Sequence, residues 1–277
     1  MGITAAFMVP HPPLIVPEVG RGQERVIQNT IDAYHAVAKR IGELRPDTIV
    51  LISPHQTMYA DYFHIAPGSQ AEGDFGRFGA QQVKIKAAYD TEFVQELCQR
   101  AGDAGLRAGT DGEIDRRLDH GTMVPLYFVH QYWKEYQLVS IGLSGFALSK
   151  HYELGQCIQQ TAKALGKDIV IIASGDLSHR LKADGPYGYA KEGPEYDRRI
   201  MEVMAKADFA KLLSFPEDFC AKAGECGHRS FVMMAGALEA ETRESETAIE
   251  ARRLSYEGPF GVGYGICSYE MASAFDL

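Results

Sequence analysis

Three of the nine histidines in the sequence closely follow an apolar run of strand length. His11 comes after residues 3–9, His55 after residues 48–52, and His179 after residues 168–173. Because the carboxyl ends of parallel strands meet at one edge of an open α/β sheet, we predict that these histidines share one site. Two histidines and one carboxylate would form the facial triad that holds non-haem Fe(II) and leaves positions open for substrate and O2.

Prolines flank two of these histidines, in Pro10-His11-Pro12-Pro13 and in Ser53-Pro54-His55. Proline fixes its own φ angle and restricts the preceding residue, so each histidine would be held on a rigid segment. A rigid segment suits a metal ligand, because less side-chain freedom is lost on binding. The alternative is that the prolines only end the strands.

Two histidines, His120 and His179, could act on a substrate. His120 follows Asp119 at an expected helix N-terminus; the alternative is an exposed histidine beside a helix cap. His179 ends the turn Gly-Asp-Leu-Ser-His, in which Asp176 or Ser178 could orient the imidazole. An oriented imidazole that titrates near neutrality is suited to general acid–base catalysis.

The elements that must position these residues alternate between strands and helices. Further apolar runs occupy residues 137–143 and, near the C-terminus, 248–256 and 263–269. Helical periodicity covers about 23–44, 150–165 and 229–242, while 60–90 suggests an antiparallel excursion or a loop with short strands. The pattern predicts an α/β fold: a single domain over 1–277 with a central, largely parallel or mixed sheet covered by helices on both faces.

Composition narrows the function further. The 277-residue chain has a net charge of −9 and no block rich in lysine and arginine, so nucleic acid and anionic membranes are poor candidate partners. No apolar run reaches the length of a membrane span, and the N-terminus lacks the basic start of a signal peptide. The five cysteines form no CxxC pair, which argues against a disulfide framework or a thiolate zinc site and favours a reducing, cytoplasmic location.

Four short blocks in order resemble those of the class III extradiol ring-cleavage dioxygenases, the LigB-type family that includes protocatechuate 4,5-dioxygenase β subunits. The blocks contain Pro-His-Pro-Pro at His11, Ser-Pro-His at His55, Asp-His-Gly-Thr at His120 and Ser-Gly-Asp-Leu-Ser-His at His179. The resemblance implies Fe(II) held by His11, His55 and a C-terminal glutamate, for which Glu225 is our choice. It also implies that His179 is the acid–base residue and that His120 contacts substrate or oxygen.

The resemblance implies cleavage of a catecholic or aminophenolic ring with O2 by a homo-oligomer, with a separate small subunit left open. Glu257 is the weaker alternative for the glutamate, and His228 is a further candidate metal ligand or substrate contact. The same superfamily contains Memo-like proteins with a Cys-Gly-Arg-type segment in place of the glutamate, and Glu225-Cys226-Gly227 has features of both. Two other functions therefore stay open: a zinc-dependent member of the fold and a Memo-like, non-catalytic binding protein.

Overall fold

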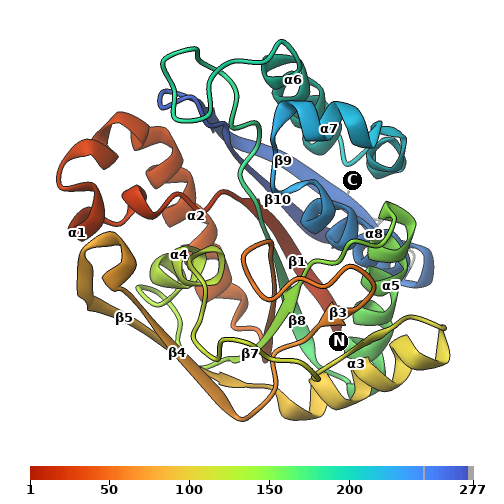
Figure 1. Cartoon of the computed structure of the whole chain (residues 1–277). Coiled ribbons are helices and arrows are strands. Elements are labelled where there is room, and N and C mark those ends of the chain that lie inside the picture. The colour runs from red at the N-terminus through yellow and green to blue at the C-terminus, as the bar shows by residue number, and fades with distance from the viewer. Residues whose placement is uncertain (246, 274–277) are drawn as a thin grey trace.

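The computed structural model describes residues 1–245 and 247–273 and contains one large mixed sheet (Figure 1). Its strand order is β4-β5-β7-β2-β8-β1-β10-β9, and β3 and β6 form a separate pair. The strands are β1 (Gly2–Val9), β2 (Thr48–Ser53), β3 (Phe63–His64), β4 (Gln70–Phe75), β5 (Ala80–Tyr89), β6 (Ala108–Gly109), β7 (Gln137–Gly142), β8 (Asp168–Ser174), β9 (Thr247–Glu257) and β10 (Tyr264–Ser273).

The five strands β5, β7, β2, β8 and β1 run parallel, whereas β4, β10 and β9 each pair antiparallel. The central strands are apolar on both faces because helices cover both sides. In β2, for example, Ile49 and Leu51 pack into one core while Val50 and Ile52 pack into the other. The predicted α/β class with a central mixed sheet is confirmed.

Helices α3, α5, α6, α7 and α8 contribute to the core on one face of the sheet, and α2 and α4 to the core on the other. Their bounds are α1 (Pro17–Gly20), α2 (Gln28–Leu44), α3 (Thr91–Asp103), α4 (His120–Val129), α5 (Leu148–Leu165), α6 (Glu192–Ala205), α7 (Glu217–Ala223) and α8 (His228–Ser245), with short 3-10 turns η1 (Pro13–Ile15), η2 (Gln23–Ile27), η3 (Gly76–Phe78) and η4 (Phe209–Ser214). Over the part of the chain that the structure describes, no helix has the length and apolarity needed to cross a membrane.

The antiparallel excursion expected in residues 60–90 is the β4–β5 hairpin, whose turn is η3. The helix expected from about residue 23 begins with the 3-10 turn η2 and becomes α-helical at Gln28. Strands β1, β8 and β2 are neighbours, so the segments that follow them leave the same edge of the sheet. This edge is where His11, His55 and His179 lie.

Candidate metal and substrate site

His11 lies just beyond β1 and is almost completely buried. Its backbone N–H donates to Asp176 Oδ1 at 2.8 Å, which ties the segment after β1 to the segment after β8. The hydroxyl of Tyr34, on α2, donates to the Pro10 carbonyl. These contacts, together with the neighbouring prolines, fix the direction in which the imidazole points.

Hydrogen bonding determines which ring nitrogen of His11 is free. His11 Nδ1 lies 2.9 Å from Ser174 Oγ, and that hydroxyl donates its proton to the Gly121 carbonyl at 2.6 Å. Because the hydroxyl has one proton and the carbonyl can only accept, Ser174 must accept from Nδ1–H. Nε2 therefore has a free lone pair, the form in which histidine binds metals.

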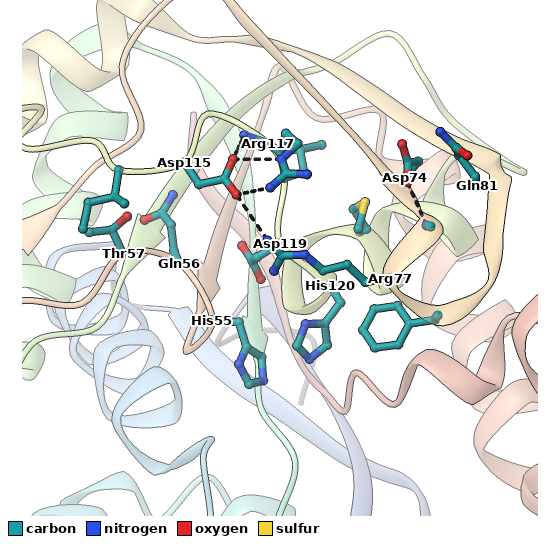
Figure 2. A pocket seen from close by; sticks show the side chains of 15 residues that line it. His55, Gln56, Thr57, Asp74, Arg77, Gln81, Asp115, Arg117, Asp119 and His120 are labelled. Atoms are coloured by element: carbon teal, nitrogen blue, oxygen red, sulfur yellow. Dashed lines mark hydrogen bonds and ion pairs between the residues drawn. The ribbon is translucent and has the colours of Figure 1, made fainter.

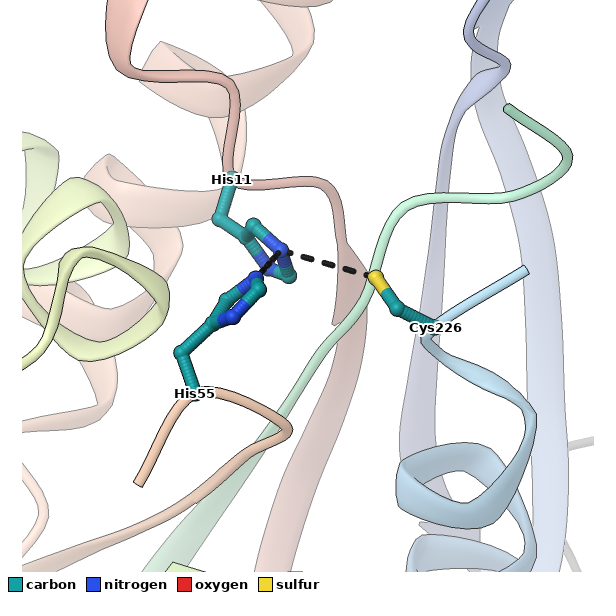
Figure 3. A group of neighbouring side chains, drawn as sticks. All are labelled: His11, His55 and Cys226. Atoms are coloured by element: carbon teal, nitrogen blue, oxygen red, sulfur yellow. Dashed lines mark hydrogen bonds between the residues drawn. The ribbon is translucent and has the colours of Figure 1, made fainter. Parts of the chain in front are cut away.

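His55 brings a second imidazole to this lone pair from the segment after β2. The two Nε2 atoms are 2.9 Å apart, and the rings meet edge to face (Figure 3). Burial lowers the pKa of His11 to about 3 and also lowers the pKa of His55, so both rings are neutral at pH 7. Two lone pairs at this distance repel unless a proton or a cation lies between them, so the geometry is suited to a metal ion.

Cys226 completes a group of three, with one candidate ligand atom each from His11, His55 and Cys226 within 4.8 Å of one another. Its Sγ lies 3.6 Å from His11 Nε2 and accepts the Asp176 N–H at 3.3 Å (Figure 3). Burial raises the pKa of the thiol well above its usual range, so without a cation it stays protonated. A bound metal would reverse this, because coordination favours the thiolate.

Two glycines allow Cys226 to approach the histidines. A Cβ on Gly175, just after β8, would lie 2.1 Å from the Gly227 Cα, and a Cβ on Gly227 would lie 2.8 Å from the Gly175 Cα. Neither position has room for a side chain. The contact brings the start of α8 against the end of β8 and so places the residue before Gly227 beside His11.

Glu225 is not a member of this group. Its Oε2 accepts the backbone N–H of His228, the first residue of α8, at 2.6 Å. Burial raises the pKa of the Glu225 carboxyl to about 7, against the opposing effect of this hydrogen bond. Its role as a metal ligand remains a prediction from the resemblance, and Cys226 is the neighbour that meets the two histidines.

The other two alternatives have structural partners elsewhere. The His228 ring is buried, with Nε2 3.0 Å from the Leu212 carbonyl and Nδ1 3.1 Å from the Tyr196 hydroxyl. Glu257 Oε2 accepts from the Thr30 N–H and hydroxyl near the start of α2. Neither side chain belongs to the group of candidate ligands at His11.

His120, the first residue of α4, lies beside His11 and His55. Asp119 accepts the Thr122 N–H at 3.1 Å, which confirms the predicted helix cap. The ring stacks on His55 at a centroid distance of 4.0 Å and lies edge to face with His11 at 5.4 Å. Burial and the neighbouring His55 lower the pKa of His120 to about 4, and the positive charge of Arg77 contributes to this shift.

His179 lies on the other side of the group, beside Asp176. Its Nε2 is 3.8 Å from Asp176 Oδ2, so Asp176, rather than Ser178, orients the imidazole. The exposed Tyr187 ring stacks on the His179 ring at a centroid distance of 5.0 Å. Asp176 thus contacts both the His11 backbone and the His179 ring.

Buried Asp197, on α6, holds the turn that carries His179. It accepts the Ser178 N–H and the Tyr256 hydroxyl, both at 2.8 Å. Burial raises the pKa of Asp197 to about 7, although both hydrogen bonds oppose this. In the unfolded chain an aspartate titrates near pH 4, so the folded protein binds this proton more tightly.

We therefore expect Asp197 to lower the free energy of unfolding as the pH rises from about 4 to about 7. Asp197→Asn has no proton to lose over this range and keeps an oxygen for the Ser178 N–H. Its stability should fall less over this range than that of the wild type, by roughly 1–3 kcal/mol, since one pKa unit corresponds to about 1.4 kcal/mol. Urea unfolding at a series of pH values measures this, with exposed Asp218→Asn as the control. Parallel curves for wild type and Asp197→Asn would contradict it.

A cavity of about 780 Å³ opens from His55 and His120 (Figure 2). Its walls come from the segment after β2, the β4–β5 hairpin and the segment before α4; besides the two histidines they include Gln56, Thr57, Asp74, Arg77, Phe78, Gln81, Asp115, Arg117, Leu118, Asp119 and Met123. Its volume is in the range of small-molecule sites. The group of His11, His55 and Cys226 therefore adjoins a space large enough for an aromatic ligand.

Sequence reasoning did not identify Ser174, Asp197 or Arg77. Ser174 had a usable signal, since it is the last residue of the strand that leads to His179. Asp197 lies within a helix far along the chain, and Arg77 in a glycine-flanked hairpin turn, and neither is marked by a local pattern. Their roles depend on contacts between distant segments.

Comparison with known proteins identifies a matching family model and several similar proteins. Residues 5–267 match the family model described as the catalytic LigB subunit of aromatic ring-opening dioxygenase. Protein CA_C1420 of Clostridium acetobutylicum is 37% identical over 99% of this chain, which spans only 58% of that protein. The 3,4-dihydroxyphenylacetate 2,3-dioxygenase of Escherichia coli is 26% identical over 84% of this chain and 89% of its own length.

A MEMO1 family protein of Pyrococcus furiosus is 25% identical over 75% of this chain and 72% of its own length. Among solved structures, an uncharacterized protein of Escherichia coli K12 aligns with a TM-score of 0.56 at 14% identity, over 96% of this chain and 99% of the other. The likeness to this solved structure concerns the fold alone. The relatives thus include both a dioxygenase and a MEMO1 family protein.

Proposed function

Since the chain belongs to the LigB family of aromatic ring-opening dioxygenases, we propose that it is a non-haem Fe(II)-dependent extradiol dioxygenase that acts on a catecholic or aminophenolic ring with O2. One observation carries this proposal. The free Nε2 lone pair of His11 faces His55 and Cys226 next to a cavity of about 780 Å³. A metal held there would be accessible to a substrate in the cavity.

In this proposal His11, His55 and Cys226 hold the metal. Imidazole and thiolate together suit iron, zinc and copper, so the donor set fits a ferrous ion without selecting it over zinc. The thiolate takes the place of the carboxylate in the facial triad, while Glu225 bonds to the start of α8. When bound, the ferrous ion would supply the redox chemistry by which O2 opens an aromatic ring.

The protein's own residues bind and orient the substrate and move its proton. His179, oriented by Asp176, accepts a proton from a substrate hydroxyl and can later return it. His120 presents a neutral imidazole at the boundary between the metal group and the cavity. Apolar side chains in the wall, including Phe78, Leu118 and Met123, contact the ring and exclude water.

The test is oxygen uptake over a panel of catechols and aminophenols, with the protein loaded anaerobically with Fe(II) and kept with a mild reductant. We expect uptake to be accompanied by a new visible absorbance from the conjugated ring-opened product. Protein loaded with Zn(II) should be inactive, and aerobic purification should lower activity until Fe(II) and reductant are restored. Turnover of a catechol with Zn(II) and no detectable iron would refute the proposed mechanism.

Cys226 favours a second candidate, a Memo-like metal-binding protein without ring-cleaving activity. The MEMO1 family relative and the presence of a thiol among the candidate ligands both support it. In this case the protein would bind metal through the same three residues and would show no oxygen uptake with any diol. A zinc-dependent enzyme would instead retain its activity without reductant.

A further inference from the structure

Arg77 lies in η3, the turn of the β4–β5 hairpin, and lines the same cavity as His55 and His120. The turn is held by Asp74, which accepts the Gly76 N–H at 2.7 Å, and it ends at Gly79, whose φ of 80° suits glycine. From there the Arg77 side chain runs above His120 toward Asp115 (Figure 2). It is 76% exposed and forms part of the cavity wall.

The acidic groups beside Arg77 are already bound to other donors. Asp115 Oδ1 accepts from Arg117 Nε at 3.0 Å, and Asp115 Oδ2 accepts from Arg117 Nη2 at 2.7 Å. Asp119 accepts from the Ser53 hydroxyl at 2.5 Å and from the Thr122 N–H and hydroxyl. Both carboxylates therefore have their strongest partners elsewhere.

Arg77 itself is weakly engaged. Its one ion pair among the described residues is the 3.6 Å approach of Nη2 to Asp115 Oδ2, which is longer than a hydrogen bond. A guanidinium has five N–H donors in a planar fork that matches a carboxylate. In this cavity those donors are available to a ligand that also reaches His55 and His120.

We propose that Arg77 binds a carboxylate substituent of the aromatic substrate and so makes the cavity selective for anionic aromatic diols. This inference rests on the proposed function, because it places the diol at the metal-binding group and the carboxylate at the hairpin turn. Arg77 is then a specificity-determining residue: it fixes the far end of the ring and leaves the metal ligands unchanged. The competing role, anchoring of the hairpin through Asp115, predicts no preference between charged and neutral diols.

The experiment compares two probes that differ in one charge, 3,4-dihydroxyphenylacetate and its primary amide. Their binding to the metal-loaded protein is measured anaerobically by calorimetry, so that turnover is not required. We expect the wild type to bind the acid about tenfold more tightly than the amide, as for a charge-assisted hydrogen bond open to solvent. Added salt should reduce this ratio, because the charges are exposed.

Arg77→Gln should weaken binding of the acid and leave binding of the amide unchanged, which brings the ratio of the two dissociation constants close to one. Arg77→Lys should restore part of the preference for the acid. Arg116→Gln is the matched control, since it removes one positive charge from a 92% exposed side chain on the nearby segment before α4. It should keep the wild-type ratio. Equal binding of acid and amide by the wild type, or an unchanged ratio in Arg77→Gln, would overturn the inference while leaving the proposed function intact. If neither probe bound, the inference would be overturned, while oxygen uptake over the panel of catechols and aminophenols would test the proposed function separately.

Discussion

His11→Ala is expected to abolish stoichiometric metal binding. The imidazole supplies a lone pair that is already directed by the Ser174 bond, and among the described residues only His55 and Cys226 join it in a group of candidate ligands. Loss of a residue that only supports a ligand costs about 10- to 100-fold in metal affinity. Loss of the ligand itself should therefore cost more than about 100-fold, measured by equilibrium dialysis with elemental analysis.

Two matched variants make this result specific. Ser174→Ala removes the acceptor of Nδ1–H and should lower the affinity within the 10- to 100-fold range. His35→Ala deletes a histidine of α2, whose Nδ1 contacts the Tyr132 hydroxyl away from the site, and should leave metal binding unchanged. Full metal occupancy in His11→Ala, with a native circular dichroism spectrum, would remove His11 from the site.

The same measurement of metal affinity distinguishes Cys226 from Glu225 as the third ligand. Cys226→Ala should weaken metal binding strongly, because its Sγ is the third atom of the group. Glu225→Ala should mainly destabilise the fold, by about 0.5–2 kcal/mol, since its carboxylate accepts the first N–H of α8. The opposite ranking in metal affinity would identify Glu225 as the ligand and would place the site closer to the facial triad.

His179→Ala is expected to keep the metal but to lower kcat by roughly 10²- to 10⁴-fold, the usual contribution of a general acid–base group. The imidazole lies beside Asp176 rather than within the group of His11, His55 and Cys226. The variant should therefore keep the metal content of the wild type while its turnover falls. The measurement pairs elemental analysis with oxygen uptake on the substrate identified from the panel.

Tyr187→Phe is the control for this variant, because it keeps the ring that stacks on His179 and removes only an exposed hydroxyl. It should retain most of the wild-type turnover. If His179→Ala lost its metal in proportion to its activity, His179 would be a ligand and its role as a proton acceptor would be refuted.

The sequence by itself determined the α/β class and the edge of the sheet at which the site lies. Continuous apolar strands must be covered on both faces, and parallel strands place their carboxyl ends together. These two facts were enough to bring His11, His55 and His179 to one edge. The capped helix that starts at His120 was also predictable, because an aspartate before an apolar helix is a local signal.

Only the tertiary structure decided which of Glu225 and Cys226 faces the histidines. Glu225 and Cys226 are adjacent in the chain, so their spacing from His179 cannot separate them. The packing of Gly175 against Gly227 sets the angle at which α8 begins, and this directs the thiol to His11 and the carboxylate to the backbone of α8. The position of Arg77 over the cavity likewise depends on how the β4–β5 hairpin folds back. Local patterns fix what a segment becomes, but contacts between segments distant in the chain fix where its side chains point.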